Sequence, residues 1–305
     1  MKKILLTLAL LLTSLASQAQ KDFQGMAVYE SKTSTADFKS RFQGNKEITP
    51  EMQKMIEDRM KKMFEKTFIL NFDKSTSIYK EEEKLDAPGT SQQGGFRMMT
   101  NIMGGGGTFY KNIKEKNYTV DKEFMGKEFL IKDSLPKLDW KMESETRVIG
   151  GYTCFKATAV RAVSATDFRN FRPKKEGDKK EEAPAKDAKT DDKEKKTNFM
   201  DEFDIPKEVT ITAWYSPEIP VSQGPENYWG LPGLILEVND GKTVILCSKI
   251  VLNAKDKVEI KAPTNGKVVG QKEYDKTMLD KMEEMRQMYG GQRGEGGRTE
   301  MRFGH

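Results

Sequence analysis

Residues 234–252 read LILEVNDGKTVILCSKIVL and hold two apolar runs on either side of Asn239-Asp240-Gly241. Asn, Asp and Gly tolerate the positive φ angles that a tight turn between antiparallel strands requires. The stretch therefore predicts a β-hairpin formed by residues 234–238 and 243–252. A β-hairpin in the most apolar part of the chain favours a sheet as the framework of the fold.

The rest of the chain shows the same apolar/polar alternation. Short runs separated by turn-forming residues predict further strands at residues 23–29, 67–72, 75–81, 108–113, 118–120, 128–132, 145–162 and 208–215. Many short strands with few helices favour an antiparallel sheet over a parallel one. We predict an α+β, mostly β fold built on one curved, half-barrel-like antiparallel sheet of about ten strands.

Two stretches have a helical period instead. Thr49-Pro50 supplies an N-cap with proline at the first helical position, and apolar residues then recur on one face. We expect an amphipathic helix over residues 50–66 against the concave face of the sheet. A second amphipathic helix is expected over residues 272–289, more loosely attached and ended by Gly290-Gly291.

The first 19 residues have the pattern of a secretory signal peptide. Lys2 and Lys3 precede an apolar core at residues 4–15, and a small-x-small site ends at Ala19. The core is shorter than the ~20 residues of a membrane-spanning helix, and no later segment approaches that length, so no transmembrane segment is expected. The protein is expected to be exported, to the periplasm or beyond, after cleavage near Ala19.

The mature chain is predicted to hold a single β-rich domain at residues 20–271. Residues 172–198 are dense in charge, with alanine as their only hydrophobic residue, so we expect a disordered insertion between neighbouring strands. The Gly- and Arg-rich residues 290–305 are expected to be a disordered tail.

Composition excludes several classes of function. The chain has 52 Lys+Arg against 47 Asp+Glu, a net charge of +5, without the concentrated basic face of nucleic-acid binders. Its single histidine is His305, which excludes a His-dependent catalytic triad or a multi-His metal site in the folded part. No cofactor is predicted.

Two cysteines, Cys154 and Cys247, lie in a chain expected to be exported, where paired cysteines are common. A disulfide between them would close a loop of roughly 90 residues and add up to about 4–5 kcal/mol of stability. The alternative is a pair of buried, unreactive thiols.

Methionines recur one helical turn apart in both predicted helices, for example at Met52 and Met55 and at Met60 and Met63. Three interpretations fit this spacing: ordinary packing of a buried face, contact with an adaptable apolar ligand or partner, and thioether binding of Cu(I).

From residue 140 to the hairpin, the chain resembles the GLPGLI family of exported bacterial proteins. The resemblance rests on Trp140, ETRVI at residues 145–149, GYTCFKA at 151–157, AWYSPEIP at 213–220, Gly224-Pro225 and the namesake GLPGLI at 230–235. It implies an envelope or secreted protein and transfers no catalytic residue.

The glycines and prolines of this signature favour turns on either side of the aromatic pair Tyr228-Trp229. One interpretation is a turn that directs the chain into the following strand. The other is a binding cleft lined by Trp214, Tyr215, Tyr228 and Trp229. Met55 and Met60 of the first helix would face the same cleft.

Three functional classes remain open. The first is a non-enzymatic exported binding protein with an apolar cleft, a carrier of a hydrophobic small molecule similar in architecture to half-barrel envelope carriers. The second is an interaction or assembly component that docks an envelope protein through the charged insertion or the tail. The third is a hydrolase that uses surface carboxylates such as Glu218 and Glu226.

Overall fold

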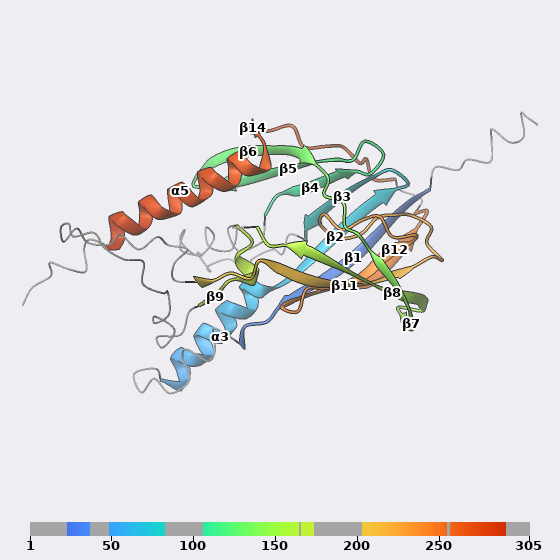
Figure 1. Ribbon diagram of the computed structural model, residues 1–305, viewed down its shortest axis with the longest axis horizontal. Helices are drawn as coiled ribbons and strands as arrows, with labels where there is room; N and C mark the ends of the chain where they lie inside the picture. Colours follow the sequence, from blue (N-terminus) through green and yellow to red (C-terminus); the bar gives the residue numbers. More distant parts are fainter. Residues whose placement is uncertain are drawn as a thin grey trace, which may run out of the picture.

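The computed structural model describes residues 23–36, 49–82, 106–164, 166–173, 203–254 and 257–290. The described chain is mostly β-structure, with a helix near each end (Figure 1). The predicted signal peptide, most of the charged insertion and the tail beyond residue 290 lie outside the described residues.

One 12-stranded mixed sheet forms the body of the molecule. Its first six strands along the chain are β1 (Gln24–Thr33), β2 (Glu65–Asp73), β3 (Thr76–Glu81), β4 (Thr108–Asn112), β5 (Asn117–Phe124) and β6 (Lys127–Ser134). The other six are β7 (Lys141–Ile149), β8 (Tyr152–Ala162), β11 (Glu208–Ser216), β12 (Leu234–Asn239), β13 (Thr243–Leu252) and β14 (Lys267–Val269).

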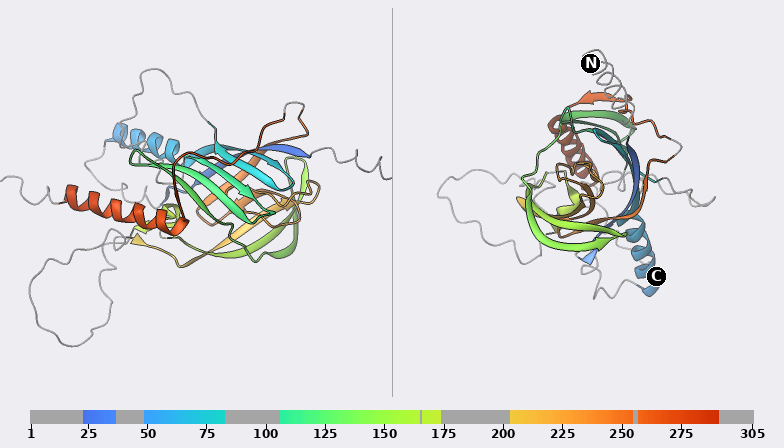
Figure 2. Two further views of the ribbon diagram at one scale, coloured as in Figure 1. Left: turned by 90° about the horizontal axis from the view of Figure 1, so that it is seen from above. Right: turned by 90° about the vertical axis from the view of Figure 1, so that its right-hand side faces the viewer.

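The spatial order of the strands is β14-β6-β5-β4-β3-β2-β1-β13-β12-β11-β8-β7. All neighbours are antiparallel except β14, which pairs parallel to β6 and was not predicted. The sheet curves strongly, so that its two ends face each other across an interior (Figure 2). The prediction of a curved, mostly β fold is confirmed, with more strands than expected and one parallel edge.

Local turn chemistry explains the hairpins. In the turn between β12 and β13, the carboxylate of Asp240 accepts hydrogen bonds from the backbone N–H groups of Lys242 and Thr243, and Gly241 has φ of 86°. Residues 145–162, predicted as one strand, form the end of β7 and all of β8. The chain reverses between them because Gly150 and Gly151 both adopt positive φ.

The charged insertion leaves and re-enters the fold at one place. Strands β8 and β11 are antiparallel neighbours, as predicted for the strands that flank it. The 3-10 helix η1 (Phe168–Asn170) follows β8, and β9 (Arg172–Pro173) then pairs with β10 (Phe203–Asp204).

Helix α3 (Pro50–Phe64) begins as predicted, with the Thr49 side chain accepting the N–H of Met52. It extends beyond one end of the sheet (Figure 1) instead of lying on the concave face. Met60 and Phe64, at its C-terminal end, are buried, whereas Met55 is 49% exposed.

Helix α5 (Gln271–Gly290) is packed more closely than predicted. Tyr274 and Met278 are buried in a hydrophobic cluster with residues of β5 and β6. The ring of Tyr274 meets Phe129 edge-on, with 5.4 Å between centroids. The N-terminal half of α5 is therefore part of the folded body.

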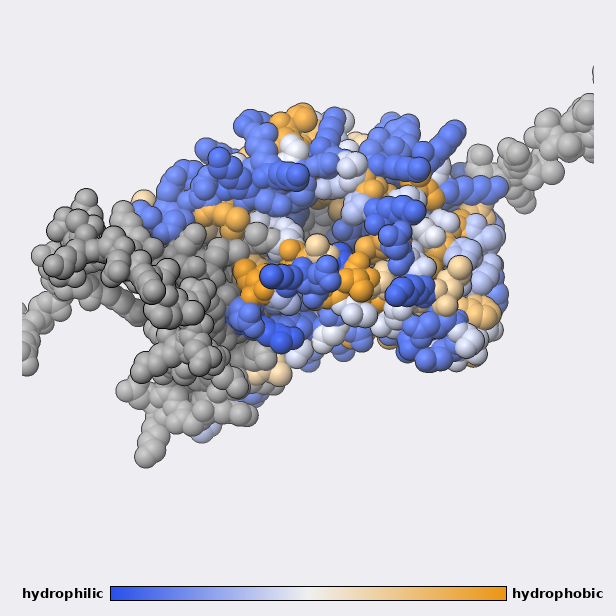
Figure 3. All heavy atoms as spheres, viewed as in Figure 1, coloured by the Kyte–Doolittle hydropathy of each residue, from blue (hydrophilic) through white to orange (hydrophobic). Residues whose placement is uncertain are grey.

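The surface around this body is mixed. On the face shown in Figure 3, hydrophilic side chains predominate towards the periphery and hydrophobic ones gather along the middle. No helix among the described residues has both the length and the apolar character needed to cross a membrane.

Candidate ligand cavity

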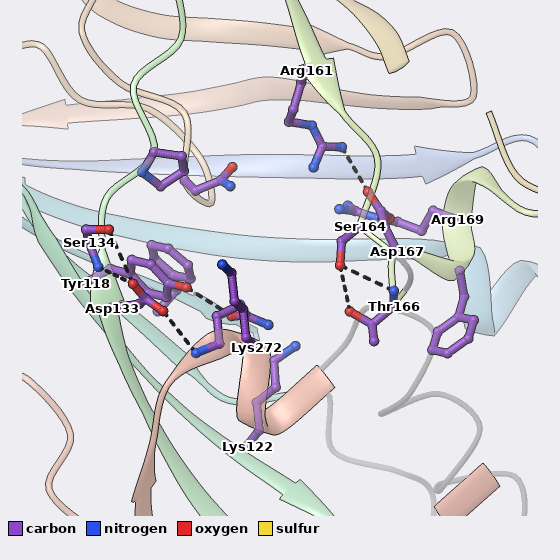
Figure 4. A pocket seen from close by; sticks show the side chains of 15 residues that line it. Tyr118, Lys122, Asp133, Ser134, Arg161, Ser164, Thr166, Asp167, Arg169 and Lys272 are labelled. Atoms are coloured by element: carbon purple, nitrogen blue, oxygen red, sulfur yellow. Dashed lines mark hydrogen bonds and ion pairs between the residues drawn. The ribbon is translucent and has the colours of Figure 1, made fainter. Parts of the chain in front are cut away.

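A cavity of about 430 Å³ lies between the two facing parts of the curved sheet (Figure 4). Its walls come from β5, β6 and the first turn of α5 on one side, and from the end of β8 and the chain leading into η1 on the other. Asn227 contributes from the loop between β11 and β12, residues 217–233, which we call the signature loop.

Ion pairs hold the η1 side of the cavity rigid. Asp167 accepts hydrogen bonds from Arg161 at 2.8 Å and from Arg169 at 3.2 Å. Burial of Asp167 opposes its ionisation, but the two guanidinium groups outweigh burial and hold the pKa of this carboxyl below its usual range. Asp167 is therefore a charged structural bridge rather than an acid that releases a proton near neutral pH.

Arg169 also joins η1 to the signature loop. Its two terminal nitrogens donate to the two carboxylate oxygens of Glu226, at 2.8 and 3.2 Å. This bidentate geometry is the strong form of an arginine–carboxylate pair. Glu226 is thus engaged in fixing the wall of the cavity.

The side chain of Lys111, in β4, holds the signature loop in place. Its ammonium group is fully buried and donates to the carbonyl oxygens of Gly224, Glu226 and Tyr228 at 2.8, 3.1 and 2.8 Å. Burial lowers the pKa of Lys111 to about 7, and the nearby Glu226 partly offsets that effect. The three carbonyl groups replace the water that the ammonium group loses on burial.

Asp133 organises the opposite wall. Its carboxylate accepts a hydrogen bond from the backbone N–H of Gln271 at 3.0 Å, which caps the start of α5. It also accepts one from the backbone N–H of Ser134 at 2.7 Å. These hydrogen bonds lower the pKa of Asp133, and the one from Gln271 makes the largest contribution.

Two lysines, Lys122 and Lys272, border the cavity. Lys122 of β5 is half-buried, and its ammonium group lies 5.8 Å from the centre of the Tyr274 ring. Lys272 is exposed at the rim. Within the described ranges, neither lysine forms an ion pair. Burial, reinforced by Arg169, lowers the pKa of Lys122, and Glu226, Asp275 and Asp167 offset part of that effect.

Aromatic rings complete the lining. Phe109 and Tyr118 stack with centroids 5.2 Å apart and planes 7° from parallel. The Tyr118 hydroxyl donates to Gln271 Oε1 at 2.9 Å, and Phe168 lines the cavity from η1. The cavity therefore combines cationic groups with flat apolar surface.

The four aromatic residues predicted to line one cleft are separated in the structure. Trp214 belongs to one buried cluster, under the guanidinium group of Arg147, whereas Tyr215 and Tyr228 belong to another. Trp229 packs near the cavity instead and donates from Nε1 to the carbonyl oxygen of Pro136 at 2.7 Å. Pro136 itself lines the cavity, so Trp229 supports its wall.

The methionines predicted to face the ligand lie elsewhere. Met55 borders a separate surface depression whose described lining residues all belong to α3, and Met60 is buried where α3 meets the sheet. No group of three or more His, Cys, Asp or Glu side chains in the described part of the chain is placed to hold a metal ion.

The disulfide expected between Cys154 and Cys247 is not formed. Both residues are free thiols in the same buried cluster, which corresponds to the alternative of two buried thiols. Burial raises the pKa of Cys154 to about 11 and that of Cys247 to about 12.

The two carboxylates considered for hydrolysis have different partners. Glu226 is paired with Arg169, whereas Glu218 accepts the backbone N–H of Thr153 at 2.8 Å. The residues that sequence reasoning missed are Lys122, Arg161, Arg169 and Lys272. Their only sequence signal was their charge, which surface lysines and arginines share.

Comparison with known proteins gives a family match over part of the chain. Residues 140–237 match the model of a family described as a protein of unknown function (Porph_ging), and this range includes Trp140 and the GLPGLI stretch. No curated protein matches the chain.

The chain is also similar to solved structures of PNGF-II. The structure in space group C2 has 15% sequence identity and a TM-score of 0.44, covering 85% of this chain and 33% of that chain. The structure in space group P21 has the same identity and coverage with a TM-score of 0.43. The chain thus spans about a third of the length of PNGF-II.

Proposed function

We propose that this chain is an exported, non-enzymatic binding protein whose ligand lies in the cavity between β5, β6, α5 and η1. The observation that carries the proposal is a cavity of about 430 Å³, a volume within the roughly 300–1,000 Å³ of small-molecule sites. The lining combines aromatic surface with a few polar groups, as such sites do.

The rigidity of the walls supports binding. Arg169 is held by Asp167 and Glu226, and Lys111 holds the signature loop that carries Asn227. A site whose groups are already positioned loses little conformational freedom when a ligand enters. The cavity differs from the cleft expected from sequence, because it adjoins α5 rather than α3 and carries charge.

Native mass spectrometry of the protein purified from an exporting cell tests this proposal. We expect the wild type to carry a non-covalent mass that denaturation releases. Asn227→Trp places a large ring in the cavity and should remove that mass. Asn117→Trp, at an exposed position at the start of β5, is the matched control and should retain it.

The result that would overturn the proposal is equally specific. A wild-type spectrum that shows only the bare chain, or a bound mass that Asn227→Trp retains in full, would mean that the cavity holds no ligand.

A further inference from the structure

The cavity carries more positive than negative charge. Its lining includes four cationic side chains, Lys122, Arg161, Arg169 and Lys272, and two acidic ones, Asp133 and Asp167. A concave site with an excess of one sign of charge favours ligands of the other sign.

The two aspartates make their direct contacts with groups other than the lysines. Asp167 is bound by Arg161 and Arg169, and Asp133 accepts backbone N–H groups at the start of α5. Neither lysine at the cavity forms an ion pair with a carboxylate in the part of the chain that the structure describes. Lys122 is the more demanding case, because it is half-buried and the carboxylates of Glu226, Asp275 and Asp167 act on it without forming a direct ion pair.

Arg161 has one buried donor without a partner. One of its terminal nitrogens binds Asp167, but its Nε is buried and has no hydrogen-bond partner among the described residues. A buried donor without an acceptor costs free energy. Figure 4 shows Arg161 on one side of the cavity and Lys122 with Lys272 on the opposite side.

The remaining lining is apolar. The stacked rings of Phe109 and Tyr118 and the side chains of Phe168 and Pro136 offer surface for a hydrophobic or aromatic body. Because the cationic groups and the rings share one cavity, a ligand that satisfies both must be amphipathic.

We propose that the ligand is a small organic anion, with a carboxylate or sulfonate group between Lys122, Lys272 and Arg161 and an apolar body against the Phe109–Tyr118 pair. This inference rests on the proposed function and assigns its ligand class. The lowered pKa of Lys122 agrees with it, because burial outweighs the nearby carboxylates and a bound anion would add a negative charge in direct contact.

Two fluorescent probes with the same rings, one with a sulfonate group and one without it, test the ligand class. Anilinonaphthalene sulfonate carries the acidic group, and N-phenylnaphthylamine has the same rings without it. We expect the wild type to bind the sulfonate about tenfold more tightly than the neutral probe. Lys122→Met and Lys272→Met should each remove most of this preference while leaving the affinity for the neutral probe unchanged.

The controls separate the site from general effects. Lys276→Met removes the same charge from an exposed position of α5 one turn further along, outside the lining, and should retain the preference. Asn227→Trp should weaken the binding of both probes. Lys272 is exposed, so Lys272→Met remains informative even if Lys122→Met fails to fold.

The outcomes distinguish the two proposals. If neither probe binds, or if both bind Asn227→Trp as well as the wild type, the proposed function fails. If both probes bind in the cavity with equal affinity, and the lysine substitutions change nothing, the protein binds small molecules and the anionic class is wrong.

Discussion

At the scale of single residues, Lys111 shows how this fold uses a buried charge. Its strand reads TFYKN, and nothing in that pattern marks the lysine as buried, because lysines are almost always at the surface. In the folded chain the ammonium group donates to three carbonyl oxygens of the signature loop. Those carbonyls belong to a loop more than a hundred positions away, so no local rule could have paired them.

Lys111→Met should destabilise the protein by about 3 kcal/mol, because it leaves two buried carbonyl groups and one part-buried carbonyl group without a donor. Urea unfolding followed by circular dichroism measures this change. Lys114→Met, in the exposed turn after β4, is the matched control and should stay within about 0.5 kcal/mol of the wild type. Equal stability of the two variants would show that Lys111 does not anchor the loop.

At the scale of elements, the two helices differ in what they contribute. Both were located from the helical period of their methionines, and α3 starts at the predicted cap. The same period cannot tell which helix has a partner surface. The structure buries Tyr274 and Met278 of α5, whereas α3 is buried only at its C-terminal end.

Met278→Ala should therefore lower the free energy of unfolding by about 2–4 kcal/mol, as expected for a buried methionine. Met288→Ala, at a position 69% exposed on the same helix, should change it by less than about 0.5 kcal/mol. Denaturant titrations of the two variants decide the point. A similar loss for both would mean that α5 does not dock through its N-terminal half.

At the scale of the whole molecule, one buried cluster ties together both halves of the sheet. It contains residues of β1, β2 and β3 together with Cys154 of β8 and Cys247 of β13. Reagents reach these thiols only when the strands around them separate. The thiols therefore report on opening of the entire sheet.

The native protein should not react with Ellman's reagent near pH 8, because burial raises the pKa of Cys154 to about 11 and that of Cys247 to about 12. Both thiols should react once guanidinium chloride unfolds the chain. Since the unfolded state loses its thiol protons first, the free energy of unfolding should fall as the pH rises above the ordinary cysteine pKa of 9.

Two results would contradict this prediction. Fast labelling of the native protein would show that the cluster is open to solvent. Absence of labelling in denaturant without a reductant would show that the two cysteines are joined.

The sequence by itself determined the features that depend on near neighbours. Alternation located eleven of the twelve strands to within a few residues or as part of a longer run. The turn at Asn239-Asp240-Gly241 and the cap at Thr49 were readable because a few adjacent residues suffice to form them. Strand β14 was missed because three residues are too few to show a period.

Only the tertiary structure decided the site. Lys122, Arg161, Asn227 and Lys272 come from four separate segments, and the curvature of the sheet brings them to one cavity. It also decided that Met55 is exposed and that the two cysteines are free. The physical reason is that periodicity shows which side of an element is apolar, whereas the partner that covers it is set by packing across the whole chain.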